Sequence, residues 1–266
     1  MVNKAKLVRS GFLRLGFNLN IRTDSARVLQ FIKKLQPQDC GIELTRIGGP
    51  GDGGYLIPRD LEGIEYCFSP GVNTISNFEN ELADLHIKSF MADYSVDGPP
   101  VARPEFTFDK KFLGSTDGGH FMTLSSWKDK YLGKYAGDLL LQMDIEGCEY
   151  EAILSTPDSL LNQFRIMAIE FHFLDRLFDP FVFSLISSCF DKILQFFYVV
   201  HAHPNNCGNS VAVDGIEVPE VIEFTFINKR RARPVGPQLS IPHKLDADNK
   251  PTAPSLHLPK HWYASQ

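Results

Sequence analysis

Apolar runs alternate with one-sided apolar stripes from residue 65 to residue 228, which is the pattern of strands separated by helices. Strands are predicted at 65–68, 88–92, 106–113, 138–143, 165–173, 196–203 and 221–228. Apolar residues three and four positions apart predict helices at 24–35, 76–85, 124–132, 148–154 and 181–194. Strands that alternate with helices form mainly parallel sheets, so we expect an α/β fold with a doubly wound sheet.

Composition divides the chain into three segments. Residues 1–60 are predicted to form a helical and glycine-rich extension, 61–230 the α/β domain and 231–266 a proline-rich extended tail. The glycine-rich stretch 46–58 predicts either a turn whose bare backbone approaches a ligand or a simple hairpin. Ser76 and Glu79 have the spacing of a capping box at the start of the helix 76–85.

Charge and composition limit the binding partners and the cellular compartment that we expect for this protein. The chain of 266 residues has a formal net charge of −5, which argues against nucleic acid as a partner. No apolar run approaches the roughly 18–20 residues that span a bilayer, so no transmembrane segment is expected. Five cysteines without a CxxC pair indicate reduced thiols and a cytoplasmic protein. Residues 1–22 are basic and carry no acid, which fits a transit peptide, a membrane-surface helix or a docked terminus.

Polar residues gather where the predicted strands end, and ligands of open α/β sheets bind at that edge. Ser69, Gly71 and Asn73 follow the strand 65–68, and the helix after them offers free N–H groups to a ligand. Asp93 ends the next strand, where a carboxylate can accept hydrogen bonds from both hydroxyls of a ribose. Together these features predict a site for a cofactor that contains adenosine.

The strongest local motif follows the strand 138–143. There Asp144 and Glu146 precede a turn at Gly147, and Glu149 lies in the first helical turn. The run Leu139-Leu-Leu-Gln-Met-Asp-Ile-Glu-Gly-Cys-Glu149, followed by Ala152-Ile-Leu154, resembles the signature of the FkbM-type methyltransferases. That family usually has lysine at the position of Gln142 and alanine at that of Cys148, and Asp-Val or Asp-Ile where Ser69-Pro70 stands here.

The resemblance implies the fold of class I methyltransferases that use S-adenosylmethionine, with a seven-stranded sheet whose last strand is antiparallel. It places Ser69, Gly71 and Asn73 in the first cofactor loop, Asp93 at the ribose and Asp144 beside the transferred methyl group. The reaction that it implies is O-methylation of a saccharide or a hydroxylated secondary metabolite. The acceptor is then the expected partner, and a homodimer is left open.

Methyl transfer to a hydroxyl needs alignment of the reactants and a group that removes the proton. The candidate bases are Asp144, His172 and His203. As an alternative, Asp144, Glu170 and His172 form a ligand set for Mg²⁺, Mn²⁺ or Fe²⁺, which could hold a vicinal diol and lower its pKa. Two other functions stay open: a metal-dependent hydrolase or oxygenase that uses this cluster with His203, and a cofactor-binding module without turnover.

Overall fold

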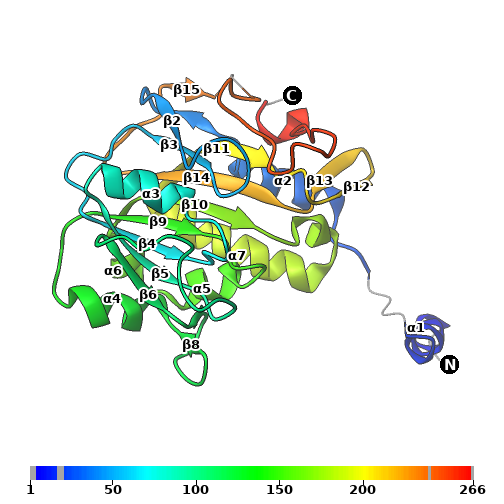
Figure 1. Ribbon diagram of the computed structural model, residues 1–266. Coiled ribbons are helices and arrows are strands. Elements are labelled where there is room, and N and C mark those ends of the chain that lie inside the picture. Colours follow the sequence, from blue (N-terminus) through cyan, green and yellow to red (C-terminus); the bar gives the residue numbers. More distant parts are fainter. Residues whose placement is uncertain (1–3, 17–20, 239–240, 265–266) are drawn as a thin grey trace.

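The structure is a computed structural model that describes residues 4–16, 21–238 and 241–264. Its central strands are β4 (Tyr66–Pro70), β5 (Lys88–Ala92), β6 (Phe106–Asp109), β9 (Leu139–Met143), β10 (Phe164–Phe171), β11 (Phe197–Pro204) and β14 (Ile222–Asn228). They form one seven-stranded sheet in the order β11-β14-β10-β9-β4-β5-β6 (Figure 1). β14 is antiparallel to both of its neighbours, and the other pairs are parallel. The predicted α/β class and the antiparallel last strand are confirmed.

Helices and a hairpin cover the two faces of this sheet. One face carries a large core beneath α2 (Ser25–Lys34), α4 (Leu124–Leu132), α5 (Glu149–Ser155), α6 (Asp158–Leu161) and α7 (Pro180–Phe196). The opposite face packs against α3 (Asn77–Asp84) and the antiparallel hairpin of β2 (Leu44–Ile47) and β3 (Tyr55–Pro58), as Figure 1 shows. Both faces are therefore shielded from solvent, and the open positions for a ligand lie at the edge where the parallel strands end.

Short elements complete the chain. α1 (Lys4–Arg14) precedes the sheet, and the 3-10 helices are η1 (Leu174–Phe178) and η2 (Lys260–Trp262). Three small strand pairs are β1 (Gln38–Asp39) with β15 (Gly236–Pro237), β7 (Phe112–Leu113) with β8 (Phe121–Met122), and β12 (Ser210–Val213) with β13 (Ile216–Pro219). In the parts of the chain that the structure describes, no helix has the length and apolar character needed to cross a bilayer.

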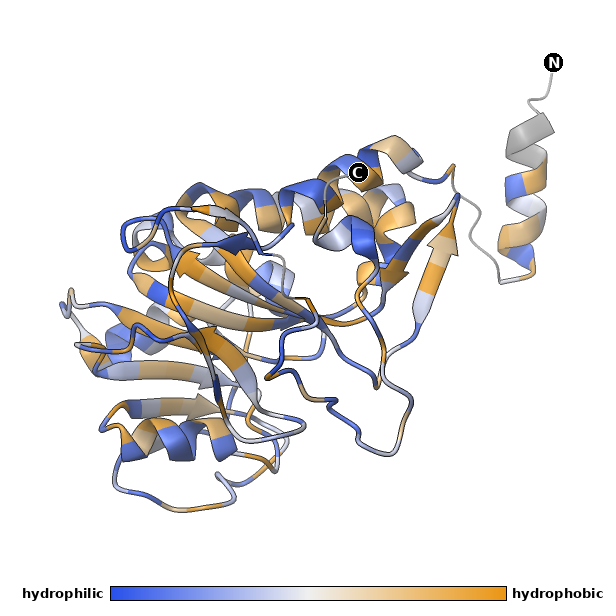
Figure 2. Cartoon of the chain, turned by 90° about the horizontal axis from the view of Figure 1, so that it is seen from above, coloured by the Kyte–Doolittle hydropathy of each residue, from blue (hydrophilic) through white to orange (hydrophobic). Residues whose placement is uncertain are grey.

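Most positions of the central strands are apolar because both faces of the sheet are covered, and the polar exceptions, such as Gln142, Arg165 and Glu170, are themselves buried. All 5 residues of β9 and all 8 residues of β10 are buried. Figure 2 shows hydrophobic colour on much of the sheet, interrupted by hydrophilic positions, while the helices alternate between hydrophobic and hydrophilic positions. The same core includes residues from both predicted extensions, among them Ile32 of α2 and the fully buried Trp262 of the tail. The indole N–H of Trp262 donates to the carbonyl of Glu217 at 3.1 Å, so the tail is fixed to the domain at this point.

Two predictions about helix starts have different outcomes. Thr23 and Asp24 are the two residues that the sequence predicts as caps of the helix 24–35, and Asp24 is the cap, since its carboxylate accepts the N–H groups of Ala26 and Arg27. The capping box at α3 is wrong, because the Ser76 side chain makes no capping hydrogen bond. Glu79 instead turns into the protein beside Ser69, where burial and a hydroxyl partner hold it away from the helix end.

Candidate functional site

A cavity of about 490 Å³ opens where β4, β5 and β9 end. Gly71, Asn73, Asp93 and Asp144 lie on its wall, so the structure brings four of the five predicted cofactor residues together. The rest of the wall is largely apolar and includes Val72, Ile75, Phe78, Phe112, Leu113 and Phe121. Small-molecule sites typically have volumes of roughly 300–1,000 Å³ and such a mixture of apolar walls with a few polar groups.

Gly71 fixes the contact between the end of β4 and the end of β9. It adopts a φ of 90°, and a Cβ added there would lie 1.5 Å from the carbonyl oxygen of Asp144. Its N–H donates to the carbonyl of Ala92, and the N–H of Asp144 donates to that of Pro70. The glycine is therefore needed for close packing between strand ends, and through that packing it places the loop 71–73 and Asp144 on one wall.

Asp93 joins the ends of β4 and β5 through its carboxylate. Oδ2 accepts the N–H of Asn73 at 2.9 Å, while Oδ1 accepts both the N–H and the hydroxyl of Ser95 at 2.7 Å. A carboxylate oxygen can accept two hydrogen bonds, so Oδ2 has capacity for one further donor from the cavity. This is the capacity that a ribose hydroxyl would use.

Ser69 does not lie on the cavity wall, although it was predicted to bind the cofactor. Its side chain is fully buried and contacts Glu79 Oε1 and, at 2.6 Å, Gln142 Oε1. The amide of Gln142 in turn donates to the hydroxyl of Tyr55 at 3.2 Å. Glu79, Gln142 and Tyr55 all line the cavity, so Ser69 supports three wall residues from behind.

A row of titratable side chains crosses the sheet next to the cavity. Glu170 of β10 pairs with Glu223 of β14, which pairs with His203 of β11. Met143 of β9 pairs with Ile169 of β10, so the next residues along these parallel strands, Asp144 and Glu170, lie side by side. Burial raises the pKa of Asp144 to about 7, and burial together with Asp144 and Glu223 raises the pKa of Glu170 well above its usual value. The side-chain amide of Asn205 donates to both oxygens of Glu170, at 3.1 and 3.0 Å.

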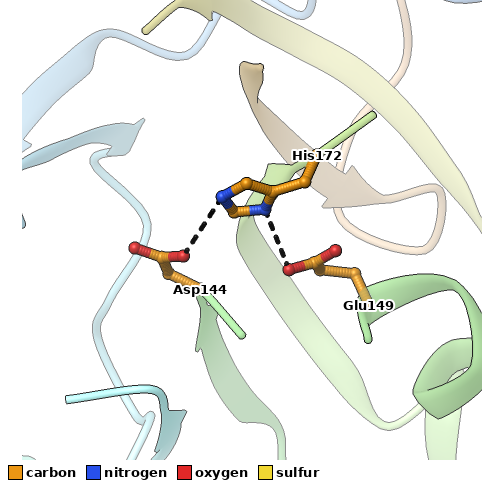
Figure 3. A group of neighbouring side chains, drawn as sticks. All are labelled: Asp144, Glu149 and His172. Carbon is orange, nitrogen blue, oxygen red and sulfur yellow. Dashed lines mark hydrogen bonds and ion pairs between the residues drawn. The ribbon is translucent and has the colours of Figure 1, made fainter. Parts of the chain in front are cut away.

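His172 lies between two groups of carboxylates. Figure 3 shows Asp144 facing one ring nitrogen and Glu149 facing the other. Nδ1 lies 3.1 Å from Glu149 Oε1, while Nε2 lies 3.4 Å from both Glu170 Oε1 and Glu146 Oε2 and 3.9 Å from Asp144 Oδ1. Burial acts to lower the pKa of His172, but the hydrogen bond with Glu149 and the charges of Glu149, Asp144 and Glu146 together outweigh burial and raise that pKa. The predicted set of Asp144, Glu170 and His172 is thus brought together.

His203 belongs to a different part of the molecule. It lies three strand spacings from Asp144, roughly 14 Å, which is too far for both to act on one acceptor hydroxyl. Its Nδ1 lies 3.5 Å from Asp246 Oδ2, and His201 Nε2 lies 2.9 Å from the other oxygen of that carboxylate. His203 lines a second cavity of about 240 Å³, bounded mainly by the tail. The structure therefore separates this predicted base from the other two.

Several residues in or near the site were not predicted individually, although one of the two predictions for the stretch 46–58 was a turn that approaches a ligand. Asp52 and Gly53 lie in the glycine-rich turn between β2 and β3 and line the cavity, so this stretch is both a hairpin and part of the candidate site. Glu149 was noted only for its place in the helix, yet its carboxylate holds His172. The place of Gln142 on the cavity wall could have been predicted, because Gln142 lies two residues before Asp144 and side chains two positions apart in a strand share a face.

No family model and no curated protein matches the sequence. Among solved structures, the chain is similar to a chain of the fibrillarin/Nop5p complex, with 12% identity over 63% of this chain and 74% of that chain and a TM-score of 0.37. It is also similar to magnesium protoporphyrin IX methyltransferase (ChlM) from Synechocystis with bound S-adenosylmethionine, with 10% identity over 62% and 71% of the two chains and a TM-score of 0.26. Likenesses this distant carry no argument about activity, and the fold assignment depends on the strand order and direction described above.

Proposed function

We propose that the protein is an S-adenosylmethionine-dependent methyltransferase that acts on a hydroxyl of a small molecule or saccharide. The observation that carries the proposal is the single cavity at the ends of β4, β5 and β9, where the loop 71–73, Asp93 and Asp144 converge. Three neighbouring parallel strands end there, which is the position where this class of sheet binds nucleotides. The FkbM-type run around Asp144 supports the choice of an oxygen acceptor.

In this proposal Asp93 accepts a ribose hydroxyl through the free capacity of Oδ2, and the adenine lies against apolar wall residues such as Val72 and Leu113. The sulfonium is then next to Asp144 and Glu146, which also line the cavity. A carboxylate favours the cationic sulfonium over the neutral thioether that remains after transfer. The acidic wall would therefore help to release the product S-adenosylhomocysteine.

Transfer needs the acceptor oxygen, the methyl carbon and the sulfur in line, and little covalent help from the protein. The acceptor oxygen attacks the methyl carbon, the carbon–sulfur bond breaks, and its electron pair stays on sulfur. The proton of the hydroxyl must leave on the way. In the proposal the proton passes to Asp144, which lines the cavity, or onward to His172, whose Nε2 is 3.9 Å from Asp144 Oδ1.

Calorimetry with S-adenosylhomocysteine and S-adenosylmethionine tests the proposal. We expect one binding site per chain, weakened about 5- to 150-fold in Asp93→Ala through the lost charge-assisted hydrogen bond. The matched control is Asp97→Ala, which removes an exposed carboxylate of the same loop that pairs with Lys110. A folded chain that binds neither compound would overturn the proposal, and equal affinities of the wild type and Asp93→Ala would remove Asp93 from the ribose role.

The Asp/Glu/His cluster around His172 supports one other candidate function, a metal-dependent hydrolase or oxygenase. That candidate predicts tight stoichiometric metal binding together with no affinity for S-adenosylmethionine. A non-catalytic module, in contrast, would bind the cofactor and transfer no methyl group to any hydroxylated acceptor. The same calorimetry, followed by a transfer assay with radiolabelled methyl groups, separates the three.

A further inference from the structure

The Glu149 carboxylate sets the orientation and the proton position of His172. Glu149 is fully buried, and its Oε1 accepts the N–H of Ile145 at 3.1 Å and that of Gly147 at 3.0 Å in addition to facing His172 Nδ1. An acceptor oxygen opposite Nδ1 fixes the hydrogen on that nitrogen. The lone pair of the neutral ring is therefore on Nε2, on the side away from Glu149.

Nε2 faces three carboxylate oxygens, from Asp144, Glu146 and Glu170. Two ligands at about 2.1 Å from a common ion lie about 3.0 Å apart at a right angle and about 3.4 Å apart at the tetrahedral angle. The separations of 3.4 Å to Glu170 and 3.9 Å to Asp144 leave room for such an ion between them. A direct hydrogen bond to Nε2 would need a shorter separation, of about 2.7–3.2 Å.

Two independent observations point to a cation at this position. Asp144 Oδ1 has no contact with solvent and accepts no hydrogen bond from the described residues. Within the described ranges, His172 is the only side chain that forms ion pairs with Asp144, Glu146, Glu149 or Glu170, and no lysine or arginine does so. A buried carboxyl group that no cationic side chain neutralises either keeps a proton or binds a cation.

We propose that His172 Nε2, Asp144 and Glu170 bind one divalent cation such as Mn²⁺, with Glu149 as the outer partner that orients the imidazole. Asp144, Glu149 and His172 have ligand atoms within 4.8 Å of one another, but the two carboxylates lie at different ring nitrogens (Figure 3). One ion cannot use both nitrogens, so Glu149 acts through His172. Two carboxylates and one imidazole suit Mn²⁺, which accepts hard oxygen ligands and nitrogen.

The ion would define the class of acceptor, and this part of the inference rests on the proposed function. Asp144 and Glu146 line the cavity, so the open positions of the ion face the space next to the transferred methyl group. An acceptor with two adjacent oxygens, such as a vicinal diol or a catechol, can fill two of these positions. The bound hydroxyl loses its proton to water or to the exposed Glu146, the oxygen attacks the methyl carbon, and the electron pair of the broken bond remains on sulfur.

Manganese binding to the full chain tests the site without any activity measurement. The chain is stripped with a chelator, and the electron paramagnetic resonance signal of free Mn²⁺ is followed during titration. We expect one ion per chain, at least tenfold weaker binding in Glu170→Gln and His172→Gln, and about 10- to 100-fold weaker binding in Glu149→Gln. Glu151→Gln is the matched control on α5, since Glu151 is exposed and its carboxylate accepts a hydrogen bond from the Ser115 hydroxyl rather than from His172. Thermal unfolding of each variant checks the fold, and Asp144→Asn replaces any variant that does not fold.

The outcomes separate this proposal from the methyltransferase proposal. A wild-type chain that binds S-adenosylhomocysteine but no Mn²⁺ overturns the metal site alone, as do folded variants that keep wild-type Mn²⁺ affinity. Mn²⁺ binding that is lost in these variants, without any affinity for S-adenosylhomocysteine, supports the metal site and rejects the transferase. Catechol should change the resonance of the bound ion whereas phenol should not. Identical spectra with the two probes would refute the chelated acceptor.

Discussion

Replacing Glu79 by glutamine should stabilise the protein, and the gain should depend on pH. Glu79 is 3% exposed, and within the described residues no lysine or arginine pairs with it. Ser69 has one hydroxyl proton for two oxygens, those of Glu79 and Gln142. If the Ser69 hydroxyl donates to Gln142 Oε1, it cannot also donate to Glu79. Glu79 then forms a hydrogen bond with Ser69 only when its own carboxyl group is protonated. Burial, only partly offset by the hydroxyl of Ser69, accordingly raises the pKa of Glu79 to about 7.

The magnitude follows from the difference between the folded and the unfolded pKa. The ordinary pKa is 4.5 and the folded value about 7, so between these pH values the folded chain keeps a proton that the unfolded chain has lost. Folding stability therefore falls as pH rises through this window. Above pH 7 the ionised Glu79 lowers the free energy of unfolding by about 3 kcal/mol, at about 1.4 kcal/mol for each unit of the shift. Glutamine is neutral throughout and can still donate to Ser69.

Urea unfolding at pH 5 and at pH 8 measures this effect. Glu79→Gln should raise the free energy of unfolding by about 3 kcal/mol at pH 8 and by less than about 1 kcal/mol at pH 5. Glu81→Gln, at a partly exposed position of the same helix, is the matched control and should change little at either pH. A gain of equal size at both pH values would refute the reasoning, because the benefit would then not come from removing an ionised carboxylate.

Three further variants test how the site and the tail are supported, each by urea unfolding. Gly71→Ala should cost about 3 kcal/mol or more, since its Cβ would overlap the carbonyl of Asp144, and a cost under about 1 kcal/mol would refute this packing role. Arg165→Met should cost about 3 kcal/mol, because it removes the 2.8 Å ion pair of the buried guanidinium with Asp138, and a neutral outcome would show that the pair contributes no net stability. Trp262→Ala should cost about 3–5 kcal/mol if the tail is part of the cooperative core, whereas an unchanged unfolding curve would mean that the tail detaches independently.

The sheet was predictable because its signal is local. A strand that is covered on both faces is mainly apolar, and Phe90–Ala92 of β5 and Leu139–Met143 of β9 show this, with Gln142 as the one polar residue among them. Helices such as α4 show the complementary one-sided pattern, and α4 has the predicted bounds. The contacts between buried side chains, in contrast, join residues that are far apart in the sequence, so no pattern along the sequence predicts them. Glu79 has the spacing of a capping residue, but Ser69 lies beside it only after β4 and α3 have packed together.

The candidate site was predictable to the extent that it depends on strand ends. Gly71, Asn73, Asp93 and Asp144 each follow a parallel strand, and the rule for ligand sites of such sheets selects these positions without further knowledge. The opposite wall could not be derived in this way. Residues such as Asp52 reach the cavity because the β2–β3 hairpin covers one face of the sheet, which is a long-range contact that local periodicity does not encode.

The two candidate histidines show how strand order decides which residues lie in one site. β10 and β11 follow one another among the long strands of the chain, which suggests that His172 and His203 lie close together. The antiparallel strand β14 comes later in the sequence but lies between them, and it inserts Glu223 into the row between Glu170 and His203. His203 is thereby displaced toward the tail and Asp246, while His172 stays beside Asp144. In the proposed reaction, the groups available to activate an acceptor are therefore His172 of β10 and the carboxylates around it.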